Sequence, residues 1–572
     1  MRRVWVTVLG VVMAGAWLAL AQEKPPAGAP PREQVGGLRF IDVSEVTIKN
    51  VEVSVTDKEG RPVTGLKRED FLVFQNGEPQ EVVNFAVYQG DTVIRPAEAE
   101  GTPAPADGGP VPTPAPRVEE RREPRFLVLL VDNENITVFN RNRVINRMSE
   151  WVREALKEPD QMMVVSYQRS LKVLQPLTSD PEDIASALRT MRTFVGGRAE
   201  VNTSRREIED FIAQDNNKTN LDRALGQARS FAREQRNNLT FTVRALQEFV
   251  SQMAGLPGKR AIIYVSDGLP MTPGLELFYE IQEQYRDPGS ISQSREYDAT
   301  AMFRSLVTSC ASAGVTLYTI DARGLQSDLG IEAENRQSRS TLSAAMTRSN
   351  YQDSLLYMAD QTGGLAIVNT NDVGPGLKRI MDDFSTYYSL GYRLVPTGTD
   401  RLHRIEVRLK GYPEYRLNYT RTFIEKTLPT RIADRVMTGL TFPVEENPLG
   451  VAVSAGEAVP TTGSRYTLPV EIRIPLASVA LIPDGEWLSG YVMVYYAARD
   501  DDGKQSDLQR LSHTIRVRPQ EYDQARGQYY TISASLLLEA GRYRISVGVR
   551  DELTNQASFA SLRREVGSVS SR

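Results

Sequence analysis

Short runs of apolar residues, separated by longer stretches of helical periodicity, occupy the middle of the chain. The runs are FLVLLV, MMVVSY, AIIYVS, VTLYTI and LAIV, between residues 126 and 368. Unbroken apolar runs of this length are typical of strands covered on both faces, and their alternation with helices indicates βαβ units. We therefore predict an α/β fold with a doubly wound, mainly parallel sheet over residues 125–427.

The helices of this region show one apolar stripe each. Val144, Met148 and Trp151 recur at helical spacing after the first strand. Another helix is predicted to begin at Asp180, a good N-cap residue, with Pro181 at its first position. Residues 200–240 are charged and mostly helix-forming, which predicts an inserted helix or helical arm.

Strand patterns without helices flank the α/β region. Val51, Val53 and Val55 alternate with polar residues, which predicts a small β domain over 41–94 that is short for a core of its own and packs on its neighbour. The runs HRIEVRL and YRLNYTRTFI predict a hairpin at the end of the α/β domain. Helical patterns end near Leu428, and residues 428–572 are predicted to form an immunoglobulin-like β-sandwich.

The N-terminus has the pattern of an export signal. Arg2 and Arg3 precede an apolar run that ends at Ala19-Leu20-Ala21, so residues 1–21 are predicted to be a signal peptide cleaved before Gln22. An uncleaved membrane anchor is the alternative. No later run is long enough to cross a bilayer, so we expect an exported protein that is periplasmic, retained at the cell envelope or secreted. Two Pro-rich stretches, 22–40 and 95–124, are predicted to be a flexible lead and a linker.

Composition narrows the choice of partners and chemistry. At 572 residues the chain needs several cores, and a net charge of −4 gives no general attraction for nucleic acid. The single cysteine, Cys310, cannot form an internal disulfide and is expected to be a buried helical residue. The two histidines, His403 and His513, lie far apart in sequence, and no phosphate-binding loop follows a strand. Catalysis by a histidine triad or by zinc therefore has little support.

Three of the predicted strands end on aspartates, namely Asp132, Asp267 and Asp321. Ligands of open α/β sheets bind beyond the carboxyl ends of the strands, so these side chains mark the expected binding edge. Two carboxylates at one edge repel each other, and a cation such as Mg²⁺ would relieve the repulsion. Alternatively, the aspartates cap helices or accept hydrogen bonds from loop amides without any metal.

Residues 125–395 resemble a von Willebrand factor A domain, and the chain is similar to the acidobacterial-type VWFA-related family of exported proteins. The resemblance rests on the order of several motifs: VEVSVTDKEGRPVTGLKREDFLVFQNGEPQEVVNF, FLVLLVDNENI, LTSDPEDIASAL, LPGKRAIIYVSDGLP, ADQTGG and YYSLGYRL. Such domains carry a metal-ion-dependent adhesion site (MIDAS), written D-x-S-x-S, with a threonine and a second aspartate from later loops.

Carried over to this sequence, the resemblance implies that Asp132 is the first aspartate of the site and Asp267 the last. Glu134 and Ile136 stand where the family has serines, so the site is degenerate. Thr240 or Thr219 could supply the threonine, and Thr240 has the better distance to Asp267. The resemblance thus predicts that Mg²⁺ or another divalent cation is held by four residues: Asp132, Glu134, Thr240 and Asp267.

We therefore expect a non-enzymatic, exported protein-binding or adhesion protein that recognises protein partners through the carboxyl edge of its α/β domain. A metal-free scaffold in a cell-envelope complex is the second hypothesis, and the loss of both serines favours it. A hydrolase is the third, but it needs a nucleophile and a base that these residues do not provide.

Overall fold

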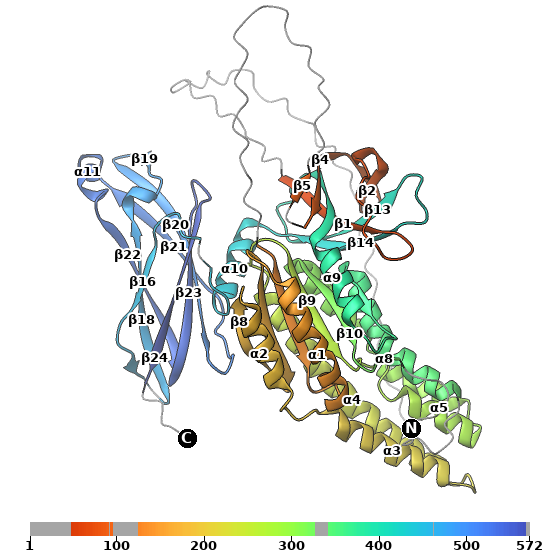
Figure 1. Cartoon of the computed structure of the whole chain (residues 1–572). Coiled ribbons are helices and arrows are strands. Elements are labelled where there is room, and N and C mark those ends of the chain that lie inside the picture. The colour runs from red at the N-terminus through yellow and green to blue at the C-terminus, as the bar shows by residue number, and fades with distance from the viewer. Residues whose placement is uncertain are drawn as a thin grey trace, which may run out of the picture. The chain divides into compact units, whose positions relative to one another are not determined.

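The computed structural model describes residues 47–90, 92–94, 124–325, 341–444, 446–461 and 463–567. The predicted signal peptide (1–21), flexible lead (22–40) and nearly all of the linker (95–124) lie outside these ranges. Among the described residues, no helix is both long and apolar enough to cross a membrane. The described residues form an α/β domain, a β domain and a β-sandwich (Figure 1).

The α/β domain is built on a six-stranded sheet with the order β11-β10-β9-β6-β7-β8. All five predicted strands are present, and neighbouring pairs among them are parallel. The sequence pattern missed the sixth, β8, which is a half-exposed edge strand antiparallel to β7. The strands are β6 (Phe126–Asp132), β7 (Gln161–Gln168), β8 (Ser170–Thr178), β9 (Arg260–Ser266), β10 (Val315–Asp321) and β11 (Ala366–Ile367). The prediction of a mainly parallel sheet is confirmed.

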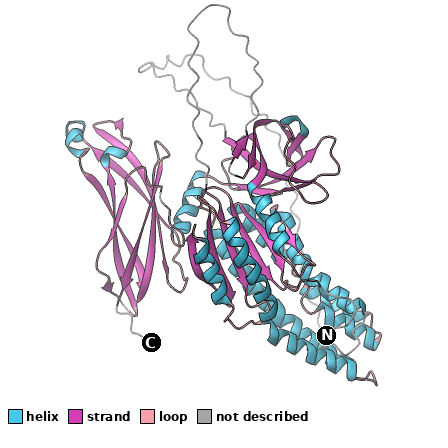
Figure 2. Cartoon of the chain, in the orientation of Figure 1, coloured by secondary structure: helices cyan, strands magenta, loops and turns pink. Residues whose placement is uncertain are grey.

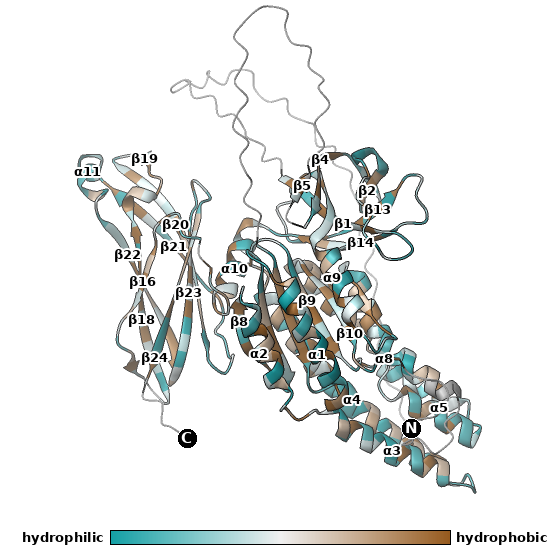
Figure 3. Ribbon diagram, in the orientation of Figure 1, coloured by the Kyte–Doolittle hydropathy of each residue, from teal (hydrophilic) through white to brown (hydrophobic). Residues whose placement is uncertain are grey.

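Helices cover both faces of this sheet (Figure 2). Alternate residues of β6 face opposite ways: Leu127, Leu129 and Val131 pack with α1 (Val138–Ala155), α2 (Pro181–Met191) and α9 (Gly374–Ser385). The intervening residues of β6 pack with the C-terminal half of α4 (Leu221–Gln252), with α7 (Thr300–Ala313) and with α8 (Thr341–Thr362). Cys310 is buried on α7, as expected. Apolar and polar residues lie on separate sides of helices α1, α2 and α9 (Figure 3).

The insertion predicted over residues 200–240 belongs to a larger helical arm with a small core of its own. The arm consists of α3 (Arg198–Gln214), the first half of α4, α5 (Leu275–Tyr285) and α6 (Gly289–Ser294), followed by a short 3-10 turn (Arg295–Tyr297). Ile212, Leu225, Phe231 and Phe278 are buried in its core. The 32-residue α4 runs from the arm to the sheet and therefore contributes to both cores.

The β domain combines two segments that are distant in sequence. Residues 41–94 were predicted to be one unit and the hairpin near residue 400 part of the α/β domain, but strands of these two segments pair with each other. The two sheets have the orders β14-β1-β12-β4-β5 and β15-β13-β2-β3. From residues 47–94 come β1 (Thr47–Thr56), β2 (Phe71–Gln75), β3 (Glu78–Gln80), β4 (Val82–Gln89) and β5 (Thr92–Ile94), with a 3-10 turn at Arg68–Asp70. The other segment gives β12 (Thr386–Leu394), β13 (Arg401–Leu409), β14 (Arg416–Tyr419) and β15 (Thr422–Glu425).

A short β segment cannot bury enough apolar surface alone, which explains this pairing. Val51 of β1 lies opposite Leu390 of β12, and Val73 of β2 lies opposite Val407 of β13. All four side chains belong to one buried core. Residues 41–94 were expected to pack on a neighbouring domain. Instead, their strands form joint sheets with the strands of residues 386–425.

The C-terminal region has two antiparallel sheets over one core. One sheet contains β16 (Ala452–Ala455), β17 (Val459–Pro460), β18 (Arg465–Pro475) and β22 (Tyr529–Glu539). The other contains β19 (Ile482–Asp484), β20 (Trp487–Asp500), β21 (Gln509–Val517), β23 (Gly541–Asp551) and β24 (Ala557–Val566). Short 3-10 turns lie at Leu476–Ser478 and Pro519–Glu521.

The prediction that helices end near Leu428 is wrong. Helix α10 (Leu428–Gly439) follows directly, and the short α11 (Tyr522–Ala525) lies within the sandwich. Ile432 and Val436 of α10 pack with Tyr495 and Phe559 of the sandwich, so this helix covers the outer side of one sheet. Thr427 caps α10 and Pro429 lies in its first turn, which is a start signal that the sequence does contain.

Candidate functional site

Asp132 is the last residue of β6 and is fully buried. Its Oδ1 accepts hydrogen bonds from the backbone N–H groups of Glu134 (3.1 Å) and Asn135 (3.0 Å). Its Oδ2 accepts a hydrogen bond from the Asn135 amide (3.0 Å) and a short one from the Tyr264 hydroxyl. The carboxylate thus ends the strand by fixing the turn that follows it, since each of its oxygens has two donors.

Asp267 directly follows β9, the neighbour of β6 in the sheet. Its Oδ2 accepts a hydrogen bond from the Thr137 N–H and its Oδ1 one from the Asn140 side-chain amide, both at 2.9 Å. The Asn135 carbonyl in turn accepts hydrogen bonds from the Asp267 N–H (2.9 Å) and the Ser266 hydroxyl (3.1 Å). The loops after β6 and β9 are therefore tied together, and both predicted aspartates lie at the carboxyl edge of the sheet. We call Asp132 and Asp267 the aspartate pair.

Glu134 and Ile136, which occupy the two serine positions of the family motif, have different surroundings. Ile136 is fully buried in the core between the sheet and α1, so it offers a hydrocarbon to that core. Glu134 lies against the backbone of Gly197: a Cβ at Gly197 would be 2.9 Å from the Glu134 carbonyl oxygen and 3.1 Å from its Cδ. The negative charge of Glu134 also acts on the aspartate pair, because it raises the pKa of Asp132.

The threonine prediction selected the wrong residue of α4. Thr240 is exposed, and its hydroxyl donates to the Arg236 carbonyl of its own helix (2.8 Å). Thr219 is also exposed, before α4 begins. Thr242 is buried instead, and its Oγ1 accepts a hydrogen bond of 3.4 Å from the Asn135 amide. Residues that are two positions apart in a helix lie on nearly opposite sides of it. This explains why Thr242 faces the site and Thr240 does not.

Burial controls the ionisation of the aspartate pair. Loss of solvent raises the pKa of Asp132 from 3.8 to about 6, although the hydrogen bonds from Tyr264 and Asn135 lower it. Burial also raises the pKa of Asp267, against the opposing effects of Arg198 and of its hydrogen bonds to Thr137 and Asn140. The Tyr264 hydroxyl, buried beside Asp132, has a pKa well above its usual value and remains a donor.

Arginines supply the positive charge near Asp267. Arg198, at the start of α3, is largely buried and lies over the ring of Tyr351, 4.3 Å from its centroid. Arg323 makes a two-pronged contact with the third strand-end aspartate, Asp321, at 2.9 and 2.7 Å. Both arginines lower the pKa of Asp267. Asp321 is thus paired within the protein and is not free for a ligand.

These residues do not fit a divalent cation of the kind that the family resemblance implies. A carboxylate has about four acceptor positions, and the four donors around Asp132 use them. Nearby guanidinium groups disfavour a second positive charge beside Asp267. Hard cations need several oxygen ligands, and no group of three or more His, Cys, Asp or Glu side chains suited to a metal occurs in the described parts of the chain.

Sequence reasoning considered Asn135 only as a source of an oxygen ligand and missed Tyr264 and Thr242; Asn135 and Tyr264 donate to Asp132, and Thr242 accepts from Asn135. Tyr264 had a signal, because it is the one phenol in the otherwise aliphatic run AIIYV before Asp267. A buried tyrosine normally needs a partner for its hydroxyl. Asn135 had a weaker signal, since an asparagine three residues after a strand-end aspartate fits many turns.

The histidines belong to the two β regions. His403 is buried on β13; its Nδ1 faces the amides of Gln75 (2.9 Å) and Asn76 (3.1 Å), and its Nε2 faces Glu425 at 3.2 Å. Because both amides are donors, Nδ1 is the acceptor and Nε2 carries the proton. His513 lies on β21 of the sandwich. Neither histidine is in the α/β domain.

No family model matches this chain, and no curated protein is significantly similar to it. Solved structures similar to part of it include an aerotolerance-related membrane protein from Bacteroides fragilis, 15% identical over 45% of this chain and 98% of that one, with a TM-score of 0.23. BatB from Bacteroides thetaiotaomicron is 13% identical over 46% and 98%, with a TM-score of 0.21. Proximal thread matrix protein 1 of the mussel byssus, with a zinc-occupied MIDAS motif, is 12% identical over 48% of each chain, with a TM-score of 0.23. At such TM-scores, no conclusion about this chain rests on them.

Proposed function

We propose that the chain is an exported, non-enzymatic protein-binding protein whose α/β domain recognises its partner without a divalent cation. The carboxyl edge of the sheet is the contact surface. Two features support this assignment: the internal hydrogen bonding of the aspartate pair and the apolar side chains exposed next to it.

The exposed side chains, which we call the apolar rim, are Val138, Phe139 and Val195. They are 43%, 76% and 75% exposed. Val138 and Phe139 form the first turn of α1, directly after the loop that Asp267 holds. Val195 precedes Gly196, whose Cβ position is 3.4 Å from Cγ2 of Val138, so the two loops adjoin. Exposed apolar residues that gather at one place favour a contact surface, whereas scattered ones do not.

The apolar rim is the observation that carries the proposal, because it offers contact area where the aspartates offer no free acceptor. Partner binding through the rim depends on apolar burial and shape. A chelator therefore leaves binding unchanged. A metal-dependent adhesion protein behaves in the opposite way, because its partner's carboxylate completes the coordination of the ion.

Site-specific photocrosslinking in the producing cells tests this proposal. A photoreactive phenylalanine analogue at Phe139 should give covalent adducts that persist in EDTA. The matched control is the same analogue at Phe241, which is 61% exposed on α4, a helix that packs on the opposite face of the sheet from α1. Equal labelling from Phe241, or loss of the Phe139 adducts in EDTA, would refute the proposal.

A further inference from the structure

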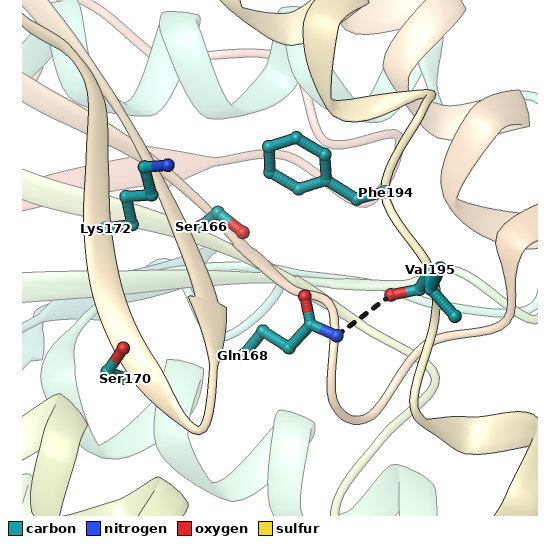
Figure 4. Close-up of a pocket in the computed structure, with 6 residues that line it drawn as sticks. All are labelled: Ser166, Gln168, Ser170, Lys172, Phe194 and Val195. Atoms are coloured by element: carbon teal, nitrogen blue, oxygen red, sulfur yellow. Dashed lines mark hydrogen bonds between the residues drawn. The ribbon is translucent and has the colours of Figure 1, made fainter. Parts of the chain in front are cut away.

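A pocket of about 380 Å³ lies beside β7, at the carboxyl edge where β6 also ends. The β7–β8 hairpin forms one side and the loop after α2 the other (Figure 4). We call it the basic pocket, and its lining residues are Ser166, Gln168, Ser170, Lys172, Phe194 and Val195. The aspartate pair does not line it.

The charged residues of the two segments that form this pocket are all basic, and the Glu134 carboxylate lies against Gly197 at the end of one of them. Lys172 lies on β8, Arg169 is at the tip of the hairpin, and Arg192 begins the loop opposite. Residues 161–178 and 192–197 contain no aspartate or glutamate. No ion pair of Lys172 occurs among the described residues. Its ammonium group is therefore available to an anion.

A buried arginine lies behind the pocket and increases this preference. The side chain of Arg141 is fully buried, and its guanidinium donates to the Asn133 side-chain oxygen (3.0 Å) and to the carbonyls of Phe194 (2.9 Å) and Arg192 (3.1 Å). These acceptors are all neutral, and within the described ranges Arg141 has no carboxylate partner. A buried cation without a counter-ion strongly favours a nearby negative charge.

A chain of hydrogen bonds leads from Arg141 to the pocket. Arg141 donates to Asn133, and the Asn133 amide donates to the Ser166 hydroxyl oxygen at 2.6 Å. Ser166 is 3% exposed and lines the pocket. In the part of the chain that the structure describes, no acceptor takes the Ser166 hydroxyl proton. In this series of hydrogen bonds, each donor is directed toward the pocket and polarises the next donor. The Ser166 hydroxyl at its end therefore requires an acceptor from a ligand in the pocket.

The remaining lining groups fix the size and character of the ligand. Gln168 donates to the Val195 carbonyl at 3.3 Å and so connects the hairpin to the opposite loop. The ring of Phe194 faces Ser166 across the opening (Figure 4). Such a pocket combines one ammonium group, hydroxyl donors and an aromatic wall, which suits a carboxylate carried on a short apolar stem.

We propose that the basic pocket binds the side-chain carboxylate of an aspartate or glutamate in a partner protein, with Lys172 and Ser166 as its direct donors. Apolar residues on either side of that acid pack against Phe194 and the apolar rim. Arg141 acts as a positioning residue behind Ser166. This inference rests on the proposed function for its partner protein, and it adds the chemistry that the partner must present.

Peptide binding to the full chain tests the inference. The probes are N-acetyl-Leu-Asp-Leu-amide and its neutral counterpart N-acetyl-Leu-Asn-Leu-amide. Binding of each peptide is measured by NMR from the backbone amide signals of Gln168, Ser170 and Val195. The aspartyl peptide should shift these signals and bind at least about tenfold more tightly than the asparaginyl peptide, as expected for a hydrogen-bonded charge pair.

Variants locate the contact. Lys172→Met should weaken the aspartyl peptide about tenfold or more. Ser166→Ala should weaken it less, because it removes one neutral donor. Lys157→Met, at an exposed lysine outside the pocket, should change nothing. Equal affinity for the two peptides, unchanged binding to Lys172→Met, or no shift at all would overturn the inference. If Phe139 still forms adducts in that case, the proposed function stands without it.

Discussion

The aspartate pair and the basic pocket lie at the same edge of one sheet, yet their polar groups are used in opposite ways. Around Asp132, four donors meet one carboxylate, and every group is satisfied within the protein. Around Ser166, a donor chain that begins at the buried Arg141 ends without an acceptor among the described residues. Strand-end aspartates therefore show where the binding edge lies, whereas unsatisfied donors show where a ligand is needed.

Removal of the Asp132 carboxylate should lower the stability of this edge of the sheet more than any other change considered. Asp132→Ala leaves the Tyr264 hydroxyl and the Asn135 amide without their acceptor in a fully buried place, which should cost about 3 kcal/mol or more. Hydrogen exchange of the β6 and β9 amides, measured by mass spectrometry, should become much faster. Asp222→Ala, at an exposed residue of α4, is the control. Unchanged protection would mean that Asp132 does not hold these loops.

The pH dependence of the same carboxylate comes next. Its pKa is raised in the fold from 3.8 to about 6, so the folded state holds the proton more tightly than the unfolded state. The stabilising contribution of this proton is present at low pH and is lost as the pH rises through about 6. At about 1.4 kcal/mol per pKa unit, the change is at most about 3 kcal/mol.

Carboxyl-carbon NMR of the labelled protein should show one buried aspartate with a midpoint near 6. That signal should be missing in Asp132→Asn. A midpoint below 4 for Asp132 would indicate that a nearby positive charge, such as a bound cation, outweighs its burial.

Loss of the phenol next to Asp132 should have a smaller effect. Tyr264→Phe removes one donor and leaves the ring in the core, which should cost about 1–2 kcal/mol. Because this hydrogen bond lowers the pKa of Asp132, its loss should move the titration midpoint above that of the wild type. A midpoint that moves down instead would contradict the role of Tyr264 as a donor.

The two threonines of α4 should show the smallest difference. Thr242→Val removes the acceptor for the Asn135 amide and should cost about 1 kcal/mol, whereas the exposed Thr240→Val should change stability by less than about 0.5 kcal/mol. Chemical denaturation followed at Trp151 of α1 measures both. Equal effects would mean that the side of α4 that faces the site has been misassigned.

The sequence could predict the sheet but not the chemistry at its edge. Apolar runs such as FLVLLV fix the strands, and the strand ends place Asp132 and Asp267 together, because these are local patterns read through one topology. Donors such as Asn135 and Tyr264 come from a turn and from the neighbouring strand, so their relation to Asp132 depends on three-dimensional packing. Strand β8 was missed for a related reason: as a half-exposed edge strand it lacks a continuous apolar run.

Strand pairing in the β domain likewise depends on contacts between residues that are distant in sequence. Val51 and Leu390 are neighbours in a sheet, but 339 positions separate them in sequence. Alternating patterns identify each strand without specifying its partner. Only the buried core that the two segments share shows that residues 47–94 and 386–425 form one unit.

Calorimetric titration of the full chain with Mg²⁺ and with Mn²⁺ tests the central claim most directly, namely that hydrogen bonds within the protein satisfy the aspartate pair. We predict no saturable heat at millimolar concentrations of either ion, for the wild type as for Asp132→Asn and Asp267→Asn. A one-site binding isotherm in the wild type that both variants abolish would contradict the account.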